Sequence, residues 1–151
     1  MNSPFNNDFK VTQIQHKNHD GLDLVGLVDK NIYSTVNGVA EYADWENGND
    51  KTQGFGKYVK IIDKNTGYGV YFGLLSEINV KVGDKVNKTD KIGVMGSTGY
   101  STGEHCHYCV RKNGKGTELD ISEFSGIPYK IGVYNDGNKG NSSNNKTNYI
   151  T

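Results

Sequence analysis

The stretch Lys91-Ile-Gly-Val-Met-Gly-Ser-Thr-Gly-Tyr-Ser-Thr-Gly-Glu-His-Cys-His-Tyr-Cys-Val-Arg111 decides the fold class of this chain. Within it, two short runs of mainly apolar residues, 91–95 and 107–111, flank a glycine-rich loop at 96–103. Short β-branched and aromatic runs bounded by turn residues predict β-strands. Similar runs occur at Phe9–Ile14, Lys57–Ile62 and Tyr68–Phe72. No convincing amphipathic helix accompanies them, so we expect a mostly β protein.

Composition restricts the classes of partner. The chain has 151 residues, with 20 glycines, 10 tyrosines and only 2 prolines, which favours many turns between tyrosine-bearing strands. Its formal net charge of zero argues against nucleic acid as a partner. No run approaches the roughly 20 apolar residues of a membrane span, so we expect no membrane insertion. Met1–Asp8 lacks the features of a signal peptide.

The end of the chain differs in composition from the rest. From Asn135 onward it is dominated by Asn, Gly, Ser, Lys and Thr, which cannot bury a core. We therefore expect one domain at residues 1–134 and a flexible tail or linker at 135–151. A tail of this kind often leads to a second module.

All four histidines fall in two clusters. His16 and His19 precede Asp23, and His105 and His107 lie far downstream. Residues at i and i+2 of a strand share a face, so His105 and His107 can converge on one point. His19 and Asp23, four apart, share a face of a strand or a helix. Three such ligands with one open position form the pattern of a catalytic zinc site.

The two cysteines have a simpler interpretation. Cys106 and Cys109 are three apart in one predicted strand, so they point to opposite faces and a mutual disulfide is not expected. Cys109 shares the face of the two histidines and is a minor ligand candidate. A buried thiol is the better interpretation.

Two further segments suggest local structure. Val80–Val86 followed by Lys91–Gly93 predicts a strand, a turn and a return strand. The loop Gly96–Gly103 lacks the Gly-Lys-Ser/Thr ending of a phosphate-binding loop. We expect this loop to line a cleft beside the metal, where small residues permit close approach of a substrate.

Four segments occur in a specific order: His19-Asp-Gly-Leu-Asp23, Val70-Tyr-Phe-Gly-Leu-Leu-Ser76, Val80-Lys-Val-Gly-Asp-Lys-Val86 and Ile92–Tyr108. In this order they resemble the lysostaphin/LytM-type zinc endopeptidases of peptidoglycan. The resemblance covers roughly residues 9–125. The stretch Met95–His107 is especially similar to phage-encoded cell-wall lysins of this family.

The resemblance implies a compact antiparallel β-sheet domain with a substrate groove. It implies that His19, Asp23 and His107 bind Zn²⁺ and that His105 is the catalytic general base. The expected substrate is a peptide bond in a peptidoglycan stem peptide or cross-bridge, and the expected place of action is the cell wall, outside the cytoplasm. We expect a monomer, to which a C-terminal wall-binding module could be linked. With no signal peptide visible, the protein would be phage-encoded or a piece of a longer chain.

One position departs from the family pattern. The family usually carries a second catalytic histidine in a Tyr-x-His-Leu-Ser-like segment, and this chain has Leu74 at that place. Leucine donates no hydrogen bond to a developing oxyanion, and losing such a donor costs about 100- to 1000-fold in rate. Three other residues stay open as substitutes for the missing donor: Tyr71, Tyr100 and His16. Tyr71 and Tyr100 are also candidate residues of the substrate groove.

Two other classes stay open. The first is a catalytically impaired zinc-binding module of the same fold that binds cell wall or regulates a partner. Leu74 favours it, and the full ligand set disfavours it. The second is a lipoyl/biotinyl-type carrier, suggested by Val80–Val86. It lacks an attachable lysine beside methionine at a hairpin apex and leaves the histidines unexplained.

Overall fold

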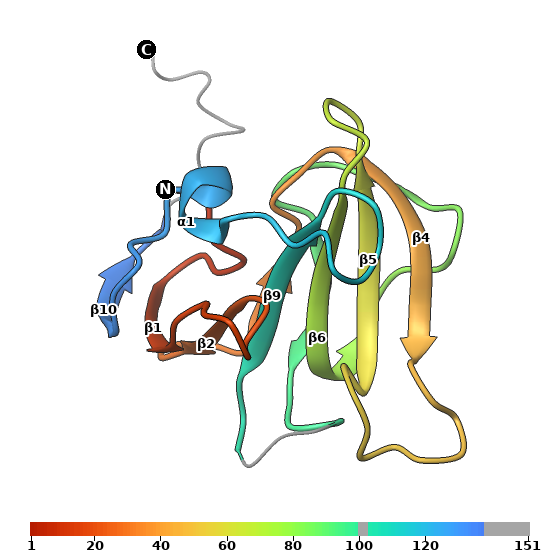
Figure 1. The fold of residues 1–151 in the computed structure, drawn as a ribbon, viewed down its shortest axis with the longest axis horizontal. Coiled ribbons are helices and arrows are strands. Elements are labelled where there is room, and N and C mark those ends of the chain that lie inside the picture. Colours follow the sequence, from red (N-terminus) through yellow and green to blue (C-terminus); the bar gives the residue numbers. More distant parts are fainter. Residues whose placement is uncertain (100–102, 138–151) are drawn as a thin grey trace.

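The computed structural model describes residues 1–99 and 103–137 of the chain (Figure 1). Within these residues the chain forms ten strands and one short helix. In chain order they are β1 (Asp8–Gln13), β2 (Leu22–Gly26), β3 (Asn31–Tyr33), β4 (Gly38–Trp45), β5 (Lys57–Asp63), β6 (Gly69–Ile78), β7 (Lys85–Val86), β8 (Lys91–Met95), β9 (Cys106–Arg111), α1 (Ile121–Ser125) and β10 (Gly132–Asn135). The expectation of a mostly β protein is confirmed.

The strands form one antiparallel sheet in which β9 is central. The strand order is β10-β1-β2-β9-β6-β5-β4-β7, and β8 pairs with both β6 and β3. Figure 1 shows β9, β6, β5 and β4 side by side, with β1, β2 and β10 gathered beyond β9 near α1. Since β9 pairs with β2 on one edge and β6 on the other, residues from three distant segments meet at this strand.

The core anchors the strands that surround β9. The side chains of Phe72 on β6 and Tyr108 on β9 are fully buried, with ring centroids 5.4 Å apart. Leu22 and Leu24 of β2 are also fully buried. The Tyr108 hydroxyl lies 2.8 Å from the hydroxyl of Thr35, so its polar end has a partner inside the core.

The strand predictions agree closely with the structure at four places. β1, β5, β8 and β9 each begin and end within one residue of the predicted runs. β6 is longer than predicted, because it continues past Phe72 to Ile78. The cysteine prediction is also confirmed, since Cys106 and Cys109 are both buried and both free.

The strand predicted within Val80–Val86 is shorter than expected, whereas the return strand at Lys91–Gly93 is present as part of β8. β6 ends at Ile78, residues 79–84 belong to no strand and contain a turn at 82–83, and only Lys85–Val86 form a strand, β7. The Asp84 carboxylate accepts a hydrogen bond from the backbone N–H of Lys81 at 2.8 Å. A side chain that satisfies the backbone in this way competes with strand pairing.

The C-terminal part contains the one helix of the described residues. The side chain of Asp120 accepts hydrogen bonds from the N–H groups of Ser122 and Glu123, and Gly126 ends the helix with φ 75°. Five residues are too few to show a helical period in the sequence. The expected tail at 135–151 begins inside β10, whose last residue is Asn135. Residues 138–151 lie outside the described residues. The described part has no helix of the length and apolarity that crossing a membrane requires.

Candidate metal centre

Strand register brings Asp23 and His107 together. They lie directly opposite each other on β2 and β9, and His107 also lies opposite Gly73 of β6. The approach of the segment before β2 to β9 depends on Gly21. A Cβ at Gly21 would lie only 2.3 Å from the carbonyl oxygen of Tyr108, so a larger residue would force the two segments apart.

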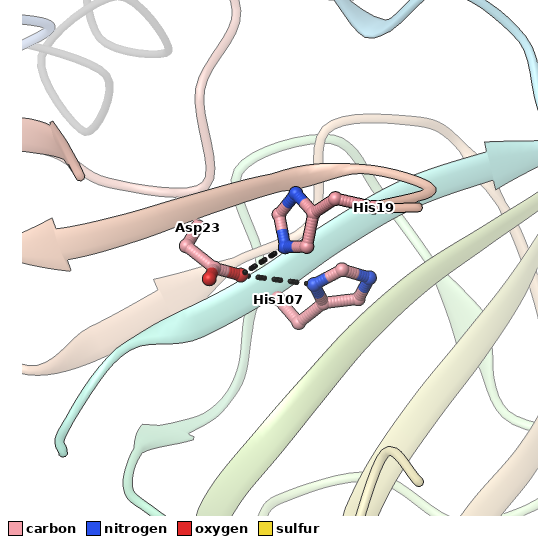
Figure 2. A group of neighbouring side chains, drawn as sticks. All are labelled: His19, Asp23 and His107. Atoms are coloured by element: carbon pink, nitrogen blue, oxygen red, sulfur yellow. Dashed lines mark hydrogen bonds and ion pairs between the residues drawn. The ribbon is translucent and has the colours of Figure 1, made fainter. Parts of the chain in front are cut away.

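Three histidines surround the Asp23 carboxylate. Its Oδ1 lies 3.1 Å from Nε2 of His19 and 2.9 Å from Nδ1 of His107 (Figure 2). Its Oδ2 lies 3.4 Å from Nε2 of His105. Histidines from both sequence clusters therefore lie around one carboxylate.

The outward-facing nitrogens of two histidines determine where their protons lie. Nδ1 of His19 is 3.1 Å from the carbonyl oxygen of Ile14, and Nδ1 of His105 is 3.0 Å from that of Gly103. A carbonyl oxygen can only accept, so Nδ1 carries the hydrogen in both rings. In the neutral imidazole, Nε2 is then left with a free lone pair facing Asp23.

Electrostatics at the centre favour charged groups. Burial raises the pKa of Asp23, but its hydrogen bonds with His107 and His19 lower that pKa. Together with the nearby histidine charges they outweigh burial, so the pKa stays well below its usual value. Burial lowers the pKa of His107, yet its hydrogen bonds with Asp20 and Asp23 raise it well above the usual value. Both shifts have one origin, the pairing of ionised carboxylates with His107, which stabilises positive charge at the centre.

The sequence interpretation missed Asp20 and Arg111. Oδ1 of Asp20 lies 2.7 Å from Nε2 of His107, and its Oδ2 accepts a hydrogen bond of 2.8 Å from Nη2 of Arg111. Strand alternation could have indicated Arg111, because it follows His107 by four residues and shares its face of β9. Asp20 had no such signal beyond its position next to His19.

A cavity of about 630 Å³ opens beside the centre. His19, Asp23, His105 and His107 contribute to its lining, and so does Leu74, which is 3% exposed. Leu74 has φ 66°, which is uncommon for a residue other than glycine, and its backbone N–H donates to the Phe55 carbonyl at 2.8 Å. The pairing of β5 with β6 shifts register at this point. An irregularity of this kind often re-aims a side chain beside a functional site.

Aromatic rings form one side of this cavity. Phe55, Tyr58 and Tyr71 all line it, with the Phe55 ring centroid 5.1 Å from that of Tyr58 and 5.4 Å from that of Tyr71. Burial raises the pKa of Tyr58 to about 12, so this phenol stays neutral at physiological pH. The predicted groove residue Tyr71 thus lies at the cavity, whereas Tyr100 lies outside the described residues.

Two other expected contributors lie elsewhere. His16 is exposed and stacks on His19 at 5.7 Å between centroids, outside the cavity lining. In the glycine-rich loop, residues 96–99 and 103, which the structure describes, contribute nothing to that lining. Thr98 and Gly99 pack instead on the loop at Gly56, where a Cβ would lie 2.3 Å from the Gly99 nitrogen.

The donor set fits a zinc ion. Ligand atoms of His19, Asp23 and His107 all lie within 4.8 Å of one another. Imidazole nitrogen and carboxylate oxygen are suitable zinc ligands, and three protein ligands leave a fourth position open. The ligand atoms of a second group, Asp20, His107 and Cys109, also lie within 4.8 Å of one another. Burial raises the pKa of the Cys109 thiol, which disfavours the thiolate that a metal requires.

Comparison with known proteins identifies relatives of this arrangement. Residues 17–119 match the model of peptidase family M23. Over 111 residues the chain is 38% identical to an uncharacterized metalloprotease of Buchnera aphidicola, covering 73% of this chain and 28% of the relative. Over 100 residues it is 36% identical to the peptidoglycan DD-endopeptidase ShyC of Vibrio cholerae, covering 66% of this chain and 22% of the relative. The chain thus spans about a quarter of the length of these relatives.

Solved structures show the same fold. The catalytic domain of lysostaphin from Staphylococcus simulans superposes with a TM-score of 0.62 at 31% identity, covering 70% of this chain and 77% of that one. A zinc-containing peptidase from Vibrio cholerae gives a TM-score of 0.59 at 26% identity, covering 73% of this chain and 35% of that one. The expected fold class and family resemblance are therefore confirmed.

Proposed function

Because the chain belongs to peptidase family M23, we propose that it is a zinc-dependent endopeptidase that hydrolyses peptide bonds of peptidoglycan. The observation that carries the proposal is the convergence of His19, Asp23 and His107 beside a cavity that His105 also lines. A general base next to a three-ligand centre and an open cavity is the arrangement that peptide hydrolysis requires.

The ligands in this proposal are Nε2 of His19, the Asp23 carboxylate and Nδ1 of His107. Bound zinc supplies a Lewis acid that polarises a carbonyl and lowers the pKa of water. Two neutral imidazoles and one carboxylate offset only one of the two positive charges, so the centre keeps net positive charge for this chemistry. Three histidines surround the Asp23 carboxylate, whose side chain is 10% exposed, so few water molecules can compete with a metal for its oxygens.

His105 is the proposed general base. Its Nδ1 donates to the carbonyl of Gly103, which holds the ring with Nε2 turned toward Asp23 and the cavity. From there Nε2 accepts a proton from the attacking water and returns it to the leaving amine. The role requires the neutral ring, whose Nε2 lone pair the Gly103 contact preserves.

The substrate class follows from the relatives. ShyC is a peptidoglycan DD-endopeptidase, so we assign stem peptides or cross-bridges of peptidoglycan as substrate and the cell wall as the place of action. The cavity of about 630 Å³ has room for several atoms of a peptide, and Phe55, Tyr58 and Tyr71 offer flat apolar contacts on one side. A role as a phage or bacterial wall lysin is part of the same proposal.

One observation favours a second candidate function. Leu74 lines the cavity with an apolar side chain at the place where the family resemblance puts a second catalytic histidine. Without that hydrogen-bond donor, hydrolysis would be slower by about 100- to 1000-fold. The alternative is a zinc-binding module that holds wall peptides or regulates a partner without efficient cleavage.

Amine release from purified peptidoglycan, with zinc content measured on the same sample, tests the proposal. We expect one zinc per chain and cleavage that is abolished by a chelator and by His105→Ala. Since His105 is outside the proposed ligand set, His105→Ala should keep its zinc. Stoichiometric zinc without cleavage on several wall types would support the second candidate. Absence of zinc from the intact protein would contradict both.

A further inference from the structure

Asp20 joins the metal centre to a fixed cation without being one of the proposed ligands. Each of its two carboxylate oxygens has one partner. Oδ1 lies 2.7 Å from Nε2 of His107, and Oδ2 accepts a hydrogen bond of 2.8 Å from Arg111. Asp20 therefore lies at the outer nitrogen of a ligand histidine, on the side away from Asp23.

The His107 ring needs such a partner to bind a metal in one orientation. Its side chain is only 12% exposed, so water contributes little to satisfying the outer nitrogen. When Nδ1 binds the metal, Nε2 carries the hydrogen and must donate it. A carboxylate acceptor at that nitrogen fixes the tautomer and the ring orientation, and it makes the ligand nitrogen more basic.

Arg111 in turn holds Asp20 in place. Its guanidinium lies over the rings of Phe55 and Tyr71, with Cζ 5.1 Å and 4.8 Å from the centroids, and its side chain is 12% exposed. It also forms an ion pair of 2.8 Å with Glu118. A guanidinium stacked on aromatic faces and paired in this way is pre-organised, so the carboxylate it binds is pre-organised as well.

The two ligand histidines therefore differ in their outer contacts. Nδ1 of His19 donates to a neutral carbonyl, that of Ile14. Only His107 has a charged acceptor. A carboxylate stabilises the imidazole N–H more strongly than a carbonyl does, because hydrogen bonds to an ionised group are about twice as strong.

Asp20 is poorly placed to bind the metal itself. A permanent cation, Arg111, lies at one of its oxygens and would repel a divalent ion. The competing donor set would also require the Cys109 thiolate and the opposite nitrogen of His107. Cys109 is fully buried, away from the cavity lining.

We propose that Asp20, held by Arg111, is a positioning residue that orients His107 for zinc through Nδ1. This inference rests on the zinc site of the proposed function. Asp20 follows directly after the ligand His19 in the chain, but its carboxylate contacts Nε2 of His107, the ring nitrogen opposite the one that faces Asp23. The resulting relay runs from Arg111 through Asp20 to His107.

The test measures zinc affinity of the full chain by competition with a chromophoric chelator. We expect Asp20→Ala to bind zinc about 10- to 100-fold more weakly than the unchanged protein. Asp20→Asn should lose less, because its amide oxygen can still accept from Nε2 while the charge is gone. Glu123→Gln, an exposed acid on α1, is the control and should leave the affinity unchanged.

Two further readouts separate positioning from a structural role. The melting temperature of the metal-free variants reports folding; if Asp20→Ala does not fold, the isosteric Asp20→Asn decides the outcome. The absorption spectrum of the Co²⁺-loaded protein reports the ligands, and we expect no thiolate-to-cobalt charge-transfer band. Such a band would place Cys109 at the metal and overturn the inference.

The outcomes also separate this inference from the proposed function. Unchanged zinc affinity in both Asp20 variants would overturn the positioning role and leave the zinc site intact. Failure of the unchanged protein to bind zinc would instead contradict the proposed function itself. A graded loss from Asp20→Asn to Asp20→Ala, with zinc still bound through nitrogen and oxygen, is the expected result.

Discussion

Asp23 and His107 face each other across two antiparallel strands, with Oδ1 of Asp23 2.9 Å from Nδ1 of His107, although 84 positions separate them in the chain. The pair links the two histidine clusters, because His19 approaches the same oxygen at 3.1 Å. Metal binding at the proposed site therefore depends on this cross-strand pair.

Removing the Asp23 carboxylate should abolish zinc binding. Asp23→Asn keeps the shape of the side chain but loses the charge that the divalent ion requires, so we expect zinc content to fall to background. Metal analysis after dialysis checks this. The matched control is Glu123→Gln, which lies on the exposed face of α1 and should retain one zinc per chain.

Zinc removal should lower the stability of the unchanged protein. A ligand that binds only the folded state adds about 4 kcal/mol when its free concentration is 1000 times its dissociation constant. We therefore expect the melting temperature to fall on addition of a chelator and to recover with excess zinc. Asp23→Asn should show neither change, and an equal response of that variant would place the stabilising ion elsewhere.

Replacing Leu74 by histidine should increase the rate of cleavage. The substitution supplies a hydrogen-bond donor at the cavity wall, and histidine tolerates φ near 66° better than most residues do. We expect amine release to rise about 100- to 1000-fold with zinc content unchanged. Leu74→Ala, which adds space but no donor, is the control. Equal rates for Leu74→His and the unchanged protein would mean that another group already supplies the donor.

Replacing Gly21 by alanine should destabilise the fold and weaken the metal centre. The new Cβ would lie 2.3 Å from the Tyr108 carbonyl oxygen and 2.7 Å from Cβ of Cys109. Overpacking of this kind costs about 1–3 kcal/mol of unfolding free energy. Urea denaturation measures the loss. Gly48→Ala is the matched control, because a Cβ there meets no atom within 4 Å.

The buried hydroxyl pair of Thr35 and Tyr108 should be important for stability. Tyr108→Phe leaves the Thr35 hydroxyl without its partner, and an unsatisfied buried polar group costs about 1–3 kcal/mol. The double variant Thr35→Val/Tyr108→Phe should lose less than the sum of the single variants. Tyr129 is 47% exposed, so the control Tyr129→Phe should change the unfolding free energy by at most about 0.5 kcal/mol. Denaturant titration of the unchanged protein, the two single variants, the double variant and the Tyr129→Phe control gives the comparison.

The sequence predicted the strands whose local pattern is strong. Three runs are short and β-branched or aromatic, with glycine, asparagine or aspartate close to their ends: Lys57–Ile62, Lys91–Met95 and the run around His107–Arg111. Local propensity and tertiary pairing agree there. Val80–Val82 has the same residue types but forms no strand, because the Asp84 side chain satisfies the Lys81 backbone in place of a neighbouring strand. Composition alone does not distinguish these two outcomes.

For the site, the sequence by itself determined which donors exist and which of them share a face. His105 and His107 are two residues apart, so the period of a strand places them on one face. Arg111, four residues after His107, lies on the same face. Only the tertiary structure decided which residues meet, because the pairing of β2 with β9 sets Asp23 opposite His107 and brings Asp20 to its outer nitrogen. Contacts between distant segments depend on strand register and on close approach at Gly21, and neither leaves a periodic signal in the chain.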